Sequence, residues 1–322
     1  SFPTRRSSDL VGARLPAMEA FDHVIVEARI DGKSYWLDGT RLGDEHLDRL
    51  EVPNYRFGLP VTAAGSALVA IVPEPLARPA TAVTLSIDAS KGLDVPAPAT
   101  AEMRFSGPDA SSVRQRFAGF SAAERNRELR KVWRDGFDAI APGKVGTYSD
   151  PATGDFVLTM TGTAQMEWTS DLGARWYEVD RSRIGWRFNI AREGEINTDA
   201  PFAFNYPDWW SSKVTIVLPY GGKGFRLQGG DAVDRTVGDL YRIRRTVSLK
   251  DGVVTMEADT RALASELPVA RAPRARADLL ELSNVGVYVR APSDYAPTEA
   301  EAEQARKSDE AEAKARGKAR GK

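Results

Sequence analysis

Alternating apolar and polar residues near the start of the chain predict a β-hairpin that turns at Asp31 and Gly32. An Asp-Gly pair between two alternating runs favours a two-residue turn, because Gly tolerates the positive φ that such a turn requires. Residues 23–30 are therefore expected to pair with residues 33–38. Successive side chains of a strand point to opposite sides, so the hairpin has two distinct faces.

The two faces of the hairpin differ in polarity. One is apolar and is expected to face the core; it comprises Val24, Val26, Ala28, Ile30, Tyr35 and Leu37. The other comprises His23, Ile25, Glu27, Arg29, Ser34, Trp36 and Asp38. In this register His23 and Asp38 are diagonal neighbours, roughly 7–8 Å apart at the backbone, a distance that a side-chain hydrogen bond can span. A three-residue turn would instead place them on opposite faces.

Further strands are predicted wherever apolar residues alternate between Gly or Pro residues. These strands are 67–72, 83–88, 101–105, 155–168 (two strands divided at Gly162), 176–190 (with Tyr177, Trp186 and Phe188), 214–218, 241–249, 253–258 and 279–289. A second Asp-Gly turn, at Asp251 and Gly252, joins two of them into a hairpin.

One helix is clearly predicted. Ser121 and Glu124 form a capping box, and an apolar stripe follows at helical spacing, made of Leu129, Val132, Trp133 and Phe137. Five Arg or Lys residues between 125 and 134 lie off this stripe. They are consistent with phosphate binding or with a solvated face, and the interleaved Glu124, Glu128 and Asp135 favour the solvated face.

These elements predict an α+β fold that is mainly β. Residues 11–79 hold the hairpin and a linker rich in turn residues, and residues 80–190 form an α+β module with one amphipathic helix. Residues 191–292 are expected to form an antiparallel β module, for which a sandwich is the simplest arrangement. Residues 293–322 are charged and poor in apolar residues other than Ala, so they predict a solvated helix or a disordered tail.

An aromatic loop, Tyr206-Pro207-Asp208-Trp209-Trp210, allows two interpretations. Its rings could stack on sugar rings or on a proline of a partner. They could equally close the open end of the β module, and we favour this second interpretation because large aromatic residues are mostly buried.

Composition narrows the possible functions of the chain. With 322 residues, 42% of them hydrophobic, and a net charge of −1, the chain can hold two domains and gives no general case for nucleic-acid binding. No apolar run approaches the roughly 20 residues of a membrane span. The absence of cysteine excludes disulfides and thiolate metal sites, and two histidines, His23 and His46, exclude a histidine metal cluster. No cofactor or metal is expected, and His46, in a charged run, is expected to be solvated.

The chemistry of the chain is concentrated in His23 and Asp38. A carboxylate that accepts from one imidazole nitrogen fixes the tautomer and leaves the other nitrogen for a nucleophile, as in a catalytic triad. The alternative is structural: His23 closes a strand end, and Asp38 begins a turn with Gly39.

The run LPAMEAFDHVIVEARIDGKSYWLDGT, from Leu15 to Thr40, resembles the His and Asp segment of the transglutaminase-like thiol enzyme core, in its bacterial form flanked by domains of unknown function. That family typically has a Phe-Asn-His-Val strand, an Asp-Gly hairpin and a Tyr-Trp-Leu-Asp-Pro-Thr strand. Here Asp22 replaces the Asn and Gly39 the Pro. The resemblance implies that His23 is the catalytic base and Asp38 its orienting partner.

The resemblance also implies a cysteine on a helix upstream of the histidine, and this chain has none. Residues 11–79 are therefore expected to be the C-terminal remnant of such a core, from an acyltransferase or protease that acts on protein or peptide amides outside the cytoplasm. Residues 1–10 look foreign, because one reading frame of a common sequencing adapter encodes them residue for residue. The alternative function is a non-catalytic β-sandwich module that binds a partner or a cell-wall component.

Overall fold

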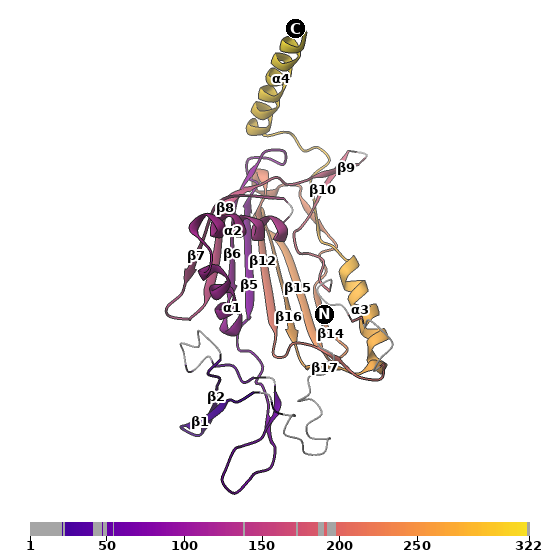
Figure 1. Ribbon diagram of the computed structural model, residues 1–322. Helices are drawn as coiled ribbons and strands as arrows, with labels where there is room; N and C mark the ends of the chain where they lie inside the picture. Colours follow the sequence, from indigo (N-terminus) through magenta and orange to yellow (C-terminus); the bar gives the residue numbers. More distant parts are fainter. Residues whose placement is uncertain are drawn as a thin grey trace.

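The computed structural model describes residues 21, 23–40, 47, 50–53, 55–137, 139–171, 173–185, 190–191 and 198–320. Its largest element is an eight-stranded sheet with the strand order β14-β15-β16-β12-β5-β6-β8-β7 (Figure 1). Neighbouring strands of this sheet are antiparallel except β5 (Thr81–Asp88) and β12 (Trp209–Val217), which pair in parallel. The fold is α+β and mainly β, as the sequence predicts.

The other strands of the large sheet are β6 (Ala97–Phe105), β7 (Ile140–Ser149), β8 (Phe156–Ala164), β14 (Val233–Val237), β15 (Tyr241–Lys250) and β16 (Val253–Ala262).

The remaining elements are short strands and helices around this sheet. A four-stranded sheet contains β13 (Arg226–Gln228), β18 (Tyr288–Arg290), β10 (Ala174–Glu178) and β9 (Thr169–Asp171). The two-stranded sheets pair β1 (Val26–Ile30) with β2 (Lys33–Leu37), β3 (Arg56–Gly58) with β4 (Val69–Ile71), and β11 (Phe202–Ala203) with β17 (Glu266–Leu267). The helices are α1 (Gly107–Ala118), α2 (Ala122–Gly136), α3 (Ala272–Asn284) and α4 (Glu299–Arg320), with short 3₁₀ turns η4 (Pro219–Gly222) and η5 (Val269–Arg271).

The two faces of the large sheet have different surroundings. Val83, Leu85 and Ile87 of β5 lie on the buried face, where they join a core that includes Leu129 and Trp133 of α2. In Figure 1, α1 and α2 lie over β5 to β8, and α3 lies beside β14 and β15. On the opposite face, Thr84 and Ser86 of β5 and Thr100 and Glu102 of β6 are exposed, so this part of the face is open to solvent, whereas Val157 of β8 is buried there.

Several predicted elements are confirmed. Strands form at 83–88, 101–105, 214–218, 241–249 and 253–258, and a shorter one, β4, lies within 67–72. Asp251 and Gly252 both have positive φ, 52° and 74°, as the predicted hairpin turn requires. The capping box is also present: the Glu124 amide donates to Ser121 Oγ, and the Ser121 amide donates to Glu124 Oε2.

The predicted break at Gly162 is wrong, because β8 runs without interruption from Phe156 to Ala164. Opposite Gly162, strand β7 carries an irregularity between Pro142 and Lys144. A Cβ atom at Gly162 would lie 2.8 Å from the Gly143 nitrogen and closer still to the carbonyl oxygen of Ala141. This glycine therefore allows the close approach of a bulged strand and does not end its own strand.

Two other predictions are corrected, and two elements were missed. Residues 279–284 end a helix, α3, and only 288–290 form a strand. The buried residues of α3 are Ala272, Ala275, Leu279 and Leu282, at spacings of three and four, a helical period that our prediction missed. The predicted strand 176–190 ends at Glu178, and its Trp186 and Phe188 lie outside the described residues. Helix α1 and strand β7 were not predicted.

The strands expected to form a separate sandwich belong to the large sheet. Strand β12 pairs with β16 on one side and with β5 on the other, so the predicted boundary at residue 190 separates two parts of one sheet. Periodicity identifies strands but carries no information about which strands pair, and this is why the sequence favoured two modules.

The charged tail forms helix α4, one of the two expected outcomes. It extends away from the large sheet in Figure 1. Its first turn is anchored by Glu301, which is only 6% exposed and accepts from the backbone amides of Leu93 and Asp94. None of the helices in the described part of the chain has the length and apolarity that a membrane crossing requires.

The close approach of β7 and β8 can be tested by Gly162→Ala. The added methyl group has no space against the β7 backbone, so we expect the free energy of unfolding to fall by about 2 kcal/mol in urea titrations. Gly119→Ala is the matched control, because Gly119 has an ordinary φ of −75° and nothing near its Cβ position. Equal stability of the two variants would contradict the crowding argument.

Candidate functional site

His23 and Asp38 form the hydrogen-bonded pair that the sequence predicts. His23 Nε2 lies 2.7 Å from Asp38 Oδ2. The pair depends on the hairpin register, in which Ala28 lies opposite Tyr35 across a turn with positive φ at Asp31 and Gly32. The predicted pairing of the two side chains is therefore confirmed, whereas their catalytic role remains a prediction.

The second oxygen of the Asp38 carboxylate is held by Thr40. The Thr40 amide and hydroxyl donate to Asp38 Oδ1 at 2.9 and 2.7 Å, so both carboxylate oxygens have partners. The Asp38 side chain is only 7% exposed. The Thr40 hydroxyl, followed by the Thr40 amide and by His23, lowers the pKa of Asp38 from its ordinary 3.8 to about 2, against the opposing effect of burial. Asp38 is thus a fixed anion at neutral pH.

The imidazole of His23 is fixed on two sides. Its ring lies 5.5 Å from the Tyr55 ring, centroid to centroid, and Asp38 engages Nε2. If Nε2 carries the proton donated to Asp38, then Nδ1 is the basic nitrogen. The side chain is 29% exposed, so a reacting group can reach it from solvent.

Ser34 shares this face of the hairpin but is engaged elsewhere. Its hydroxyl donates to Glu27 Oε1 at 2.6 Å, and Arg29 Nε donates to the same oxygen at 3.2 Å. An activated serine nucleophile would instead donate to the base, here His23. The structure therefore gives no support to Ser34 as the nucleophile.

The opposite face of the hairpin was expected to face the core, and this expectation is wrong. Val24 is 81% exposed, Val26 58% and Ile30 43%, whereas Ala28 and Tyr35 are half-buried. An apolar face is buried only if another element packs on it, and alternation along one hairpin cannot supply that element.

A cleft of about 730 Å³ opens against the hairpin, and neither His23 nor Asp38 is among the residues that line it. One wall is the hairpin, through Glu27, Ser34 and Trp36, which alternate with Asp38 on the same face. The facing wall includes residues 50–52 and 74–78. This volume lies within the range of small-molecule and peptide sites. The sequence did not reveal the cleft, because its two walls come from separate segments.

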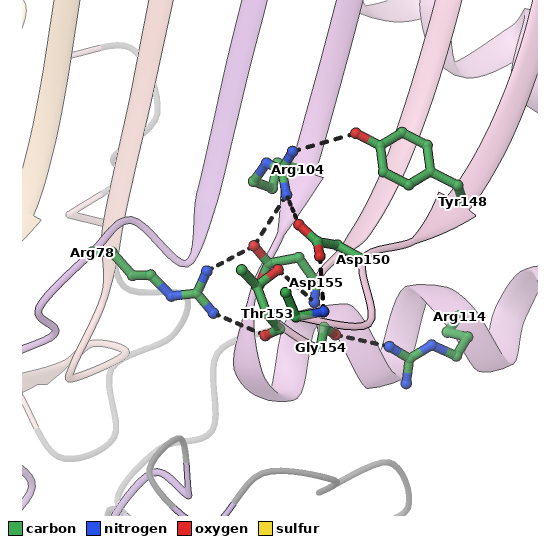
Figure 2. Close-up of polar contacts among 9 residues, drawn as sticks. Arg78, Arg104, Arg114, Tyr148, Asp150, Thr153, Gly154 and Asp155 are labelled. Atoms are coloured by element: carbon green, nitrogen blue, oxygen red, sulfur yellow. Dashed lines mark hydrogen bonds and ion pairs between the residues drawn. The ribbon is translucent and has the colours of Figure 1, made fainter.

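The wall at Arg78 is anchored by a polar cluster that the sequence analysis also missed (Figure 2). Asp155, 1% exposed, accepts from Arg78 at 2.7 Å and from Arg104 at 3.2 Å. Burial raises the pKa of Asp155, but hydrogen bonds, foremost that of Arg78, outweigh it and the pKa is lowered. Arg104 also reaches the hydroxyl of Tyr148 at 3.3 Å. These residues are far apart in the sequence, so no local sequence pattern predicts that they form a cluster.

The aromatic loop favours the interpretation in which its rings pack against the protein itself. Trp210 is 8% exposed within the main core, and the Arg261 guanidinium covers the Trp209 ring at 4.6 Å.

Two further expectations concern metal ligands and His46. Among the described residues, no three His, Asp or Glu side chains gather as a metal site would require. His46 lies outside the described residues.

Comparison with known proteins adds no family or function. No protein-family model, curated protein or solved structure matches this chain.

The anchoring of Asp38 by Thr40 can be tested by Thr40→Val. Removal of the hydroxyl should raise the pKa of Asp38 from about 2 toward 3.8, measured by NMR titration of its carboxyl carbon. Because the folded-state pKa is depressed, the carboxylate stabilises the hairpin above pH 3.8, and this contribution disappears as the pH falls through about 2. Ser34→Ala, which alters only the Glu27 contacts, should leave the Asp38 midpoint unchanged. An unshifted midpoint in Thr40→Val would refute the assignment.

Proposed function

We propose that this chain carries the base and orienting residues of a transglutaminase-like thiol acyltransferase or protease that acts on protein or peptide amides. The observation that supports this proposal best is the 2.7 Å hydrogen bond between His23 and Asp38, the two residues that the resemblance assigns to these roles. The thiolate would come from a polypeptide segment outside these 322 residues, because the chain contains no cysteine.

The geometry of the pair suits proton transfer to and from a thiol. With Asp38 on Nε2, His23 can accept the thiol proton at Nδ1, so that a thiolate attacks the amide carbonyl carbon. The same imidazolium then returns the proton to the leaving amine as the carbon–nitrogen bond breaks, which leaves a thioester. Water or an amine resolves the thioester in a second step. Asp38, held as an anion by Thr40, stabilises the imidazolium throughout.

The cleft against the hairpin offers room for a substrate. Trp36, which lines it, lies two residues before Asp38 on the same face of the strand, so a chain that extended from the cleft along this face would approach the pair. Arg78, tied to Asp155, fixes another part of the cleft wall. Fixed walls would limit the positions that a bound chain can take.

The 322-residue protein itself should be inactive. Without a thiolate, the imidazole has no nucleophile to activate, so we expect no release of ammonia or amine from glutamine or peptide substrates. Turnover that disappears in His23→Ala would show that the chain holds its own nucleophile and would overturn this expectation.

A longer chain that includes the segment encoded upstream of Val11 provides the direct test. We expect that segment to place a cysteine at the start of a helix, and the longer protein to show acyl transfer or hydrolysis. His23→Ala should remove essentially all of the rate, and Asp38→Asn should lower kcat by about three to four orders of magnitude while the fold is retained. His46→Ala is the matched control and should retain the wild-type rate. An Asp38→Asn enzyme near the wild-type rate would exclude the proposed orienting role.

A further inference from the structure

The open face of the large sheet carries an unbroken row of hydroxyl groups. Six adjacent strands each contribute one Thr or Ser, and each residue is the register partner of the next. This hydroxyl row consists of Thr161 (β8), Thr100 (β6), Ser86 (β5), Thr215 (β12), Thr255 (β16) and Ser248 (β15).

The hydroxyl row faces solvent. Thr161, Thr100, Ser86 and Ser248 are exposed, and Thr215 and Thr255 are half-buried. At the centre of the row, the Thr215 hydroxyl donates to the Ser86 hydroxyl at 2.8 Å, which orients both groups across the junction of β12 and β5. Neighbouring strands lie about 4.8 Å apart, so the row extends for about 24 Å.

Strand propensity alone does not account for this pattern. Thr is common at exposed strand positions, but so are the long charged residues that keep open sheets soluble, and the hydroxyl row contains none. Several charges that flank it are paired across strands. Lys213 bonds Glu257 at 2.8 Å, and Arg244 bonds Asp259 at 2.9 Å. At the β7 end the row is followed by Lys144, the register partner of Thr161. The surface around the row is therefore rich in hydrogen-bonding groups and carries charges of both signs.

An aromatic ring lies on the same face. Tyr148 of β7 is 42% exposed and is the register partner of Val157, two residues before Thr159 and four before Thr161 on β8. Arg104 contacts the Tyr148 hydroxyl, so the ring is oriented (Figure 2). A flat aromatic ring on the same face as a row of hydroxyl groups matches the two sides of a sugar, its apolar CH face and its polar rim.

We propose that the open sheet face binds a neutral linear polysaccharide along the hydroxyl row. Each sugar unit advances by a length close to one strand spacing, so successive sugar hydroxyls can exchange hydrogen bonds with successive strands. A polyanion is disfavoured because the surface offers no excess positive charge. A crystalline polysaccharide is disfavoured as the ligand because its surface is flat, whereas the twist of the sheet rotates the hydroxyl row from strand to strand. A flexible single chain can follow this rotation.

Affinity electrophoresis in native gels tests this proposal with the 322-residue protein. The probes are a soluble β-1,4-glucan, an α-1,6-glucan and a soluble β-1,4-linked N-acetylglucosamine polymer. We expect at least one probe to retard the wild-type protein. The triple variant Thr100→Val, Thr161→Val and Thr215→Val should bind at least tenfold more weakly, because valine keeps the branched shape but lacks the hydroxyl. Thr169→Val on β9, outside the large sheet, is the control and should bind like the wild type.

Other results would overturn the proposal. Absence of retardation by all three probes would do so, as would equal retardation of the triple variant with unchanged circular dichroism. Retardation by heparin alone would identify a polyanion as the ligand. A wild-type dimer in sedimentation that becomes monomeric in the triple variant would identify a second copy of the chain as the occupant. Tyr148→Ala, which leaves the row intact, should also weaken binding to the glycan, so the result does not depend on one variant folding.

Discussion

The parallel pairing of β5 with β12 is the constraint on which the rest of the structure depends. It runs from Thr81 opposite Trp210 to Asp88 opposite Val217 and joins two antiparallel groups of strands into one sheet. Backbone hydrogen bonds from Ala80 to Trp209 and from Ala89 to Val217 extend it at both ends. Parallel neighbours need a long connection, and this one holds α1 and α2, which cover one face of the sheet. The other face stays open as a consequence, and the hydroxyl row crosses this junction.

The candidate active site depends much less on that sheet. The His23–Asp38 pair is built within a single hairpin, and the ion pair between Arg56 of β3 and Glu266 of β17, at 2.8 Å, links the neighbouring segment to the main body. The cleft needs both parts, because one wall is the hairpin and the other includes Arg78, fixed by the buried Asp155. The pair is therefore a local feature, whereas the cleft is a tertiary one.

Two buried charges show where sequence patterns fail. Arg245 is 1% exposed, and its guanidinium donates to the carbonyl oxygens of Ser182 at 2.6 Å and Val285 at 2.8 Å. Glu301 stands in a run that looks solvated, yet it accepts from the amides of Leu93 and Asp94. A buried charge is tolerated when it forms hydrogen bonds with backbone groups from distant segments. The residues next to the charge in the sequence do not predict which backbone groups these are.

The sequence by itself determined the features that arise from near neighbours: the Asp31-Gly32 turn, the register that brings His23 to Asp38, and the Ser121 cap of α2. Turn geometry, strand alternation and capping are local interactions, so they can be inferred from a few consecutive residues. Only the tertiary structure decided that β12 joins β5 and that Val24 and Val26 lie uncovered. Burial and strand partnership depend on residues more than 100 positions apart, and periodicity within one segment cannot specify them.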